Sequence, residues 1–304
     1  MDSHRRPFHY GWIVLAMATL VVTGALGLAR FGYSMVLPDM EQGLSMHDTG
    51  AGLLASANLI GYMMLALVGG ALASRFGPRV VIAAGLAVCG LSMLLTGAVQ
   101  TFAGALIWRT VTGIGSGASN VPAMGLLAAW FAPRRRGLAM GIGVAGSAVA
   151  LVVLGPVVPR VLQTHGADGW RVCWYGFGAV ALLLAVMAFL ILRNSPREMG
   201  LAAVASDELQ ADAQPAAADR VGALDWGAVY RSGAVWHLGL VYIAFGFSYI
   251  IYMTFFVRYL VGEFGYTKPE AGNLFMTMGW FSLFCGLIWG TVSDRIGRKR
   301  ALMI

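Results

Sequence analysis

Eight apolar runs, each close to the length that crosses a lipid bilayer, occupy most of this 304-residue chain. They cover about residues 11–37, 49–73, 80–99, 102–131, 137–162, 172–192, 234–261 and 271–291. Hydrophobic residues make up 58% of the chain and charged residues only 12%, and the charges fall between the runs. A water-soluble domain cannot use that much apolar surface, so the runs predict membrane-spanning helices of about 20 residues each. A cleaved signal peptide, the alternative for the first run, would have a shorter apolar region and a cleavage site of small residues.

Charge and cysteine content exclude several classes of protein. The formal net charge of +7 arises in loops and forms no stripe or tail, so no nucleic-acid partner is expected. Cys89, Cys173 and Cys285 lie singly in apolar runs, without zinc or disulfide spacing. The glycines of residues 141–146 fit G-x-G-x-x-G, but they follow a basic loop instead of a strand. We therefore expect no cofactor, and we assign these glycines and those of residues 113–117 to close helix packing.

The distribution of basic residues predicts the orientation of the chain. Loops on the amino-terminal side hold fifteen Lys or Arg residues, whereas the opposite loops hold only Arg160, Arg171 and Lys268. The positive-inside rule then places the amino terminus and the polar stretch after the sixth run in the cytoplasm. In a bacterium this corresponds to an integral protein of the inner membrane.

Two short basic stretches form an internal repeat. Residues 70–79 read GALASRFGPR and residues 290–299 read GTVSDRIGRK, 220 positions further on. Each closes one apolar run and opens the next. A second pair supports the duplication, because residues 45–48 and 267–270 both have the hydroxyl-to-carboxylate spacing of a capping box at a helix start.

The basic stretches resemble the loop between the second and third helices of each half of the major facilitator superfamily. The first copy has Ser74 where the second has the acidic Asp294. The resemblance implies an all-α membrane fold with a six-helix N-terminal bundle at 1–193, a cytoplasmic linker at 194–233 and an incomplete C-terminal bundle at 234–304. The last unit would hold two helices and the start of a third, so we expect a chain truncated at its C-terminus. It also implies an inner-face gate made of Gly70, Ser74, Arg75, Gly77, Arg79, Gly290, Asp294, Arg295, Gly297 and Arg298.

Two arginines inside predicted spans are the main candidates for substrate binding. Arg30 precedes Pro38 by eight residues and Arg109 follows Thr101 by eight, so each lies about 12 Å below the outer boundary. A guanidinium at this depth needs a cavity or a partner, and paired donors suit a carboxylate. Arg109 also has a structural alternative, because Arg109-x3-Gly113-x-Gly115 resembles a superfamily motif whose arginine bonds neighbouring backbone. The candidate substrate-binding set is Arg30, Arg109, Tyr33, Ser116, Asn120, Asn58, Tyr62, Tyr249 and Tyr252.

Other residues have plain structural alternatives. Tyr249 and Tyr252 belong to an aromatic face of the seventh span, which either packs on neighbouring helices or lines a cavity. Arg258, near the end of that span, is expected to extend to the outer interface. No acidic residue lies in mid-span, so a carboxylate that relays a coupling proton would belong to further helices.

Further stretches narrow the resemblance. Residues 9–12 (HYGW) and 193–200 (RNSPREMG) look like bacterial monocarboxylate and oxalate/formate-type carriers, and residues 27–33 resemble a less characterised branch. They imply a monomeric secondary transporter that moves a small organic anion, such as a monocarboxylate, by alternating access, with proton coupling left open. The alternatives are a non-transporting sensor or interaction protein of the same fold, and an efflux carrier for another metabolite. An enzyme is not expected, because no nucleophile–base pair or metal cluster appears.

Overall fold

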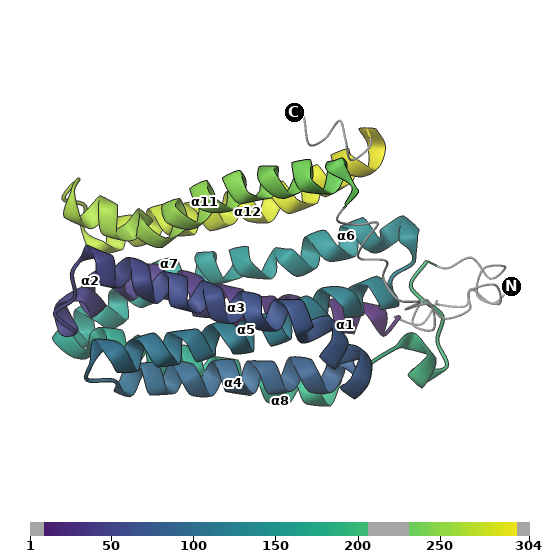
Figure 1. The fold of residues 1–304 in the computed structure, drawn as a ribbon, viewed down its shortest axis with the longest axis horizontal. Coiled ribbons are helices and arrows are strands. Elements are labelled where there is room, and N and C mark those ends of the chain that lie inside the picture. Colours follow the sequence, from purple (N-terminus) through teal and green to yellow (C-terminus); the bar gives the residue numbers. More distant parts are fainter. Residues whose placement is uncertain (1–8, 206–230, 297–304) are drawn as a thin grey trace, which may run out of the picture.

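A computed structural model describes residues 9–205 and 231–296 and consists of long helices that lie side by side (Figure 1). The long helices are α1 (Gly11–Val22), α2 (Gly32–Gly43), α3 (Asp48–Phe76), α4 (Pro78–Ala98), α5 (Phe102–Trp130), α6 (Pro133–Val144), α7 (Gly146–His165), α8 (Gly169–Ile191), α11 (Gly233–Gly262) and α12 (Lys268–Ile296). Short 3-10 turns cover Gly166–Asp168 and Pro196–Met199. Within these residues the only strand-like pairing is an isolated bridge between Phe131 and Val204. The predicted all-α fold is confirmed.

Several stretches meet the length and apolarity of a membrane span. Among the described residues these are Gly11–Gly43, Thr49–Phe76, Pro78–Ala98, Pro133–Ile191 and Val235–Gly262. The stretch from Pro133 to Ile191 contains α6, α7 and α8. Helix α5 is not in this set, because glycine, serine and threonine along its length lower its hydropathy.

Helix α5 packs closely against α3 and α4 because glycines remove side chains at the contacts. A Cβ atom placed on Gly113 would lie 1.9 Å from the carbonyl oxygen of Asn58, and one on Gly117 would lie 2.4 Å from that of Tyr62. On the other side of α5, a Cβ atom on Gly115 would lie 2.6 Å from the carbonyl oxygen of Gly85. The predicted use of these glycines for close helix approach is confirmed.

The first helical stretch is longer and less regular than its sequence predicts. The prediction ends it near Leu37, but the helix continues through Pro38 to Gly43. Its middle part, Thr23–Phe31, is a π-helix, in which each backbone hydrogen bond spans one residue more than in an α-helix. The Thr23 hydroxyl donates to the carbonyl oxygen of Gly146 at 2.8 Å and so fastens the π segment to α7.

Of the two predicted capping boxes, one is confirmed. The amide and hydroxyl of Thr267 both donate to Glu270, at 2.8 and 2.7 Å, at the start of α12. At the start of α3 the N-cap residue is His47, and Ser45 has a φ of 50°. The box predicted at 45–48 is therefore wrong, because Ser45 lies in a tight turn before the helix begins.

The linker predicted at 194–233 is described only at its two ends. At its first end, residues 194–205 pair with the backbone at the end of α5. The Val204 amide donates to the carbonyl oxygen of Trp130 at 2.9 Å, and the Ala132 amide donates to that of Val204 at 3.1 Å. This part of the chain therefore lies on the end of the first bundle.

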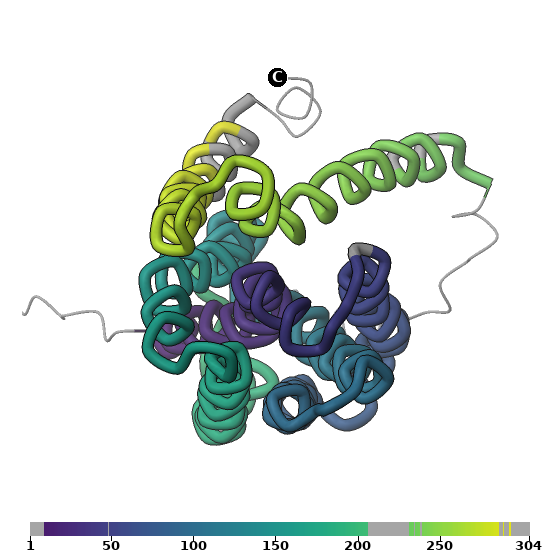
Figure 2. The backbone as a smooth tube through the Cα atoms, turned by 90° about the vertical axis from the view of Figure 1, so that its left-hand side faces the viewer, coloured from purple at the N-terminus to yellow at the C-terminus, as the bar shows by residue number. Residues whose placement is uncertain are grey.

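Helices α11 and α12 lie along one side of the preceding helices, and α12 packs mainly on α7. Figure 2 shows that α11 starts well to the side of the first bundle and approaches it toward its other end. Accordingly, Met253 and Val257 are buried, whereas Leu240 and Phe247 are 64% and 73% exposed. We call the two ends of the molecule the Arg79 end, where α11 stands apart, and the Glu41 end, where it makes contact.

Candidate functional site

Arg30 lies where the π segment faces α3 and α11. Its guanidinium carbon is 5.7 Å from the centre of the Tyr62 ring, and it is close enough to Tyr249 on α11 to interact electrostatically. The side-chain amide of Asn120 on α5 donates to the Tyr62 hydroxyl at 2.9 Å. Within the described part of the chain, no hydrogen bond or ion pair occupies the Arg30 guanidinium. The structure thus brings together four predicted site residues around one uncommitted cation.

Arg109 occupies a different, fully enclosed position. Its side chain is 1% exposed, and Nη1 donates to the carbonyl oxygen of Ala29 at 2.7 Å. The guanidinium lies over the Tyr33 ring, with its carbon 4.4 Å from the ring centre. Since Ala29 belongs to the π segment, Arg109 stabilises the backbone that carries Arg30. These contacts agree with the structural alternative for Arg109, in which the arginine bonds neighbouring backbone.

Two further predicted residues belong to this enclosed layer. The Tyr33 hydroxyl donates to the carbonyl oxygen of Ala51 at 2.8 Å, and the Asn58 side-chain amide donates to that of Arg109 at 3.1 Å. Both side chains are buried. In this conformation the described hydrogen bonds of Tyr33, Asn58 and Arg109 go to backbone carbonyl oxygens of neighbouring helices.

The last two predicted binding residues lie apart from the cluster. Ser116 donates to the carbonyl oxygen of Thr112 at 3.0 Å and contacts the Cys89 sulfur on α4 at 3.6 Å. Tyr252 is 54% exposed, and its ring packs on Phe256 with 5.3 Å between centres. Phe256 stacks on Phe275 of α12, so the C-terminal part of the aromatic face packs against a neighbouring helix.

The predicted gate residues divide into three groups. Gly70, Ser74 and Arg75 are exposed, and the Ser74 hydroxyl donates to the carbonyl oxygen of Ala71 in its own helical turn. Gly77 and Arg79 contact Asn194, the third residue after α8. The second copy is outside the described structure at Gly297 and Arg298, and the surroundings of Gly290 and the side chains of Asp294 and Arg295 are likewise not described.

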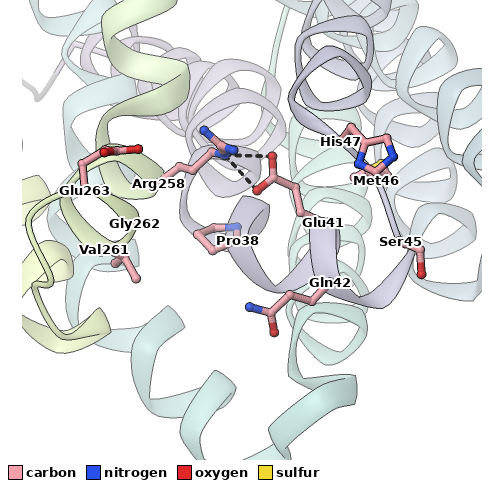
Figure 3. Close-up of a pocket in the computed structure, with 10 residues that line it drawn as sticks. All are labelled: Pro38, Glu41, Gln42, Ser45, Met46, His47, Arg258, Val261, Gly262 and Glu263. Carbon is pink, nitrogen blue, oxygen red and sulfur yellow. Dashed lines mark hydrogen bonds and ion pairs between the residues drawn. The ribbon is translucent and has the colours of Figure 1, made fainter.

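The sequence analysis missed an ionic contact between the two halves at the Glu41 end. Arg258 Nε of α11 lies 2.9 Å from both carboxylate oxygens of Glu41 (Figure 3). Lys268 Nζ of α12 lies 2.5 Å from Asp39 Oδ1. Arg258 was expected to extend to the outer interface, and its carboxylate partner was not foreseen. The signal that was missed is that the helix continues past Pro38, which places Asp39 and Glu41 on α2.

A cavity of about 500 Å³ opens beside the Glu41–Arg258 pair. Figure 3 shows its lining, with the two side chains directed toward each other across the gap between α2 and α11. The lining residues are Pro38, Glu41, Gln42, Ser45, Met46, His47, Arg258, Val261, Gly262 and Glu263. The contact between the halves at this end thus depends on charge as well as on packing.

Comparison with known families decides the affiliation of the chain. The family model of the Major Facilitator Superfamily matches residues 19–304. The chain belongs to this superfamily. It is therefore an integral membrane protein, and the resemblance of its two basic loops to those of the superfamily is explained.

Relatives within the superfamily include carriers of organic acids. The chain is 25% identical over 278 residues to a hexuronate transporter of Bacillus subtilis, with 90% of this chain and 62% of the relative covered. It is 26% identical over 277 residues to a probable sulfoacetate transporter of Cupriavidus necator, with coverages of 89% and 62%. The chain thus spans somewhat less than two thirds of the length of these relatives.

Solved structures show the same superfamily fold. A bacterial homologue of the human lysosomal transporter Spinster matches with a TM-score of 0.68 and 20% identity. The match covers 97% of this chain and 64% of that structure. At this identity the likeness concerns the fold alone.

Proposed function

We propose that the protein transports a small organic anion, such as a monocarboxylate, whose carboxylate binds Arg30. The observation that carries this proposal is a partly buried guanidinium for which the described residues supply no acceptor, placed between helices of the two halves. A carboxylate would accept its paired donors and compensate its charge. A neutral ligand would leave the cation without a counter-ion in a poorly hydrated place, which is costly.

The surroundings of Arg30 suit a ligand with oxygen atoms beyond its carboxylate. Tyr62 and Tyr249 each bring a phenol, and Asn120 holds the Tyr62 hydroxyl in place. The names of the relatives, a hexuronate and a sulfoacetate carrier, agree with an acidic substrate. We infer that Arg30, Tyr62, Asn120 and Tyr249 contact the ligand directly, while Arg109, Tyr33 and Asn58 position them.

The proposed transport cycle is alternating access, in which one half rocks against the other around the Arg30 site. The described conformation fits one stage of it. Ion pairs join the halves at the Glu41 end, and α11 stands apart at the Arg79 end. With the Arg79 end in the cytoplasm, as the positive-inside rule predicts, the site would be open to the cell interior.

The test is uptake of labelled acids into proteoliposomes by the full chain. We expect saturable uptake of an acid from a panel of glucuronate, lactate and sulfoacetate, with no uptake of neutral glucose. Arg30→Gln should abolish acid binding, and Arg30→Lys should retain part of it. Arg160→Gln, at an exposed arginine, is the matched control. Acid binding that survives Arg30→Gln, or a preference for glucose, would refute the proposal.

A further inference from the structure

Residues 194–204 are held across the Arg79 end of the first bundle. The carbonyl oxygen of Arg193 accepts from the Trp130 indole at 3.1 Å, and that of Ala202 is 3.0 Å from His9 Nε2. Together with the backbone pairing of Val204, these bonds fix the segment at both of its ends. It joins the ends of α1, α5 and α8, which the sequence separates widely.

Asn194 of this segment completes the start of α4. The N-cap residue of that helix is Gly77, which has no side chain, and the next residue, Pro78, has no amide hydrogen. The first free amide of the helix is that of Arg79, and it donates to Asn194 Oδ1 at 2.9 Å. Asn194, which lies far from Gly77 in the sequence, therefore accepts the hydrogen bond that an N-cap side chain normally accepts.

Glu198 determines which atom of the Asn194 amide faces α4. One carboxylate oxygen accepts from Asn194 Nδ2 at 2.8 Å, and the other accepts from the Asn194 backbone amide at 3.0 Å. Because Nδ2 is turned toward Glu198, the acceptor Oδ1 is turned toward the Arg79 amide. The three residues form one chain of hydrogen bonds that begins on the Glu198 carboxylate.

The loop between α3 and α4 is shaped to receive this amide. Gly77 has a φ of 86°, and a Cβ atom there would lie 2.9 Å from Asn194 Oδ1. The Arg79 side chain donates from Nε to the carbonyl oxygen of Phe189 at 2.5 Å and lies over the Phe189 ring. The loop thus contacts Asn194 through Gly77 and α8 itself through the Arg79 side chain.

We propose that Asn194 and Glu198 are positioning residues that clamp the 70–79 loop to the end of α8. The first copy of the repeat has Ser74 where the second has Asp294, and the Ser74 hydroxyl donates within its own turn, to the carbonyl oxygen of Ala71. The Glu198 carboxylate supplies the acidic anchor through Asn194. The loop then moves as one body with the first half, and its role in closing the Arg79 end rests on the transport function proposed above.

Hydrogen exchange of the peptide that covers the start of α4 tests the clamp in the full chain. Asn194→Ala removes the acceptor, so we expect about fivefold faster exchange, as for the loss of an ordinary N-cap. Glu198→Gln turns a donor toward Asn194, and Asn194→Asp opposes two carboxylates, so each should also accelerate exchange. The double variant Asn194→Asp/Glu198→Gln restores all three hydrogen bonds with the charge moved, and exchange should return to within twofold of the parent.

Ser195→Ala, in the same segment, is the control and should leave exchange unchanged. Parent-like exchange in Asn194→Ala, or a double variant no better than the single ones, would overturn the clamp. In transport assays the single variants should lower kcat at constant KM, and the double variant should recover it. Faster exchange without a change in kcat would overturn the gating role alone. A parent protein that moves no acid would refute the proposed function, and exchange would still decide the clamp.

Discussion

Neutralising Glu41 should open the Glu41 end of the molecule. In Glu41→Gln the side chain keeps its shape and one acceptor, but it loses the negative charge of the carboxylate, whose two oxygens both accept from Arg258 Nε. The Glu41 carboxylate is 14% exposed and the Arg258 side chain 32% exposed, so water screens this pair only in part. Exposed ion pairs contribute about 0.2–1 kcal/mol, and hydrogen bonds to charged groups contribute about 1.5–3 kcal/mol.

An intermediate loss of about 1–2 kcal/mol follows for the contact between the halves. Since about 1.4 kcal/mol corresponds to a factor of ten, the population open at the Glu41 end should rise roughly fivefold to thirtyfold. The second pair, Lys268 with Asp39, remains and limits the shift. Reversing both charges, in Glu41→Arg/Arg258→Glu, should restore most of the closed population.

Spin labels on cysteines introduced at Ser45 and Phe264, one on each half, would report the opening by pulsed electron resonance. Cys285 is exposed and must be replaced, whereas Cys89 and Cys173 are buried. Glu263→Gln is the matched control, because this exposed carboxylate lines the same cavity. An unchanged distance distribution in Glu41→Gln, or an equal shift in Glu263→Gln, would show that the ion pair does not hold this end closed.

Three further predictions follow from packing, buried charge and capping. Gly113→Ala should greatly reduce the yield of folded protein, because the new Cβ atom would lie 1.9 Å from the Asn58 carbonyl oxygen. Gly125→Ala on the same helix is the control, since its Cβ atom would meet nothing within 4 Å, and it should express normally. In Arg109→Lys the shorter cation should lose the hydrogen bond to the carbonyl oxygen of Ala29. Breaking a buried charge contact usually costs about 3–5 kcal/mol, so the free energy of unfolding should fall by about that amount. A melting temperature as high as that of the parent would contradict this. The hydrogen bonds from Thr267 hold the pKa of Glu270 below its ordinary value of 4.5, so this cap stabilises α12 above that pH and is lost as the pH falls through the lowered pKa. The protection factors of the amides at the start of α12, which compare exchange with the intrinsic rate at the same pH, should therefore fall in acid, and Glu270→Gln should remove this change.

Periodicity and length predicted most of the fold, because helices in lipid must satisfy their own backbone and therefore follow the apolar runs. The bounds of α4, α5 and α11 agree with the prediction to within a few residues. The prediction failed at Pro38, which was read as a helix end. Its missing amide is tolerated inside the helix, and Asp39 and Glu41 therefore lie on α2.

The candidate site was predictable as a set of residue types but not as an arrangement. Arg30 and Arg109 have similar depths by sequence count, yet one is uncommitted and the other bonds the backbone of the neighbouring segment. The difference arises from the π-helix at Thr23–Phe31, which no residue pattern in the sequence specified. Contacts between distant segments, such as Arg79 with Asn194, are equally invisible to local periodicity.

The two ends of the molecule differ in how they are fastened, and this difference has a mechanical consequence. At the Glu41 end, charged pairs join the first half to α11 and α12, so they must separate whenever that end opens. At the Arg79 end, the described polar contacts of the 70–79 loop stay within the first half. Rocking of the halves therefore breaks hydrogen bonds at one end and leaves these bonds of the loop intact at the other. Variants at Glu41 should consequently shift the balance between conformations, whereas variants at Asn194 should change the rigidity of one half.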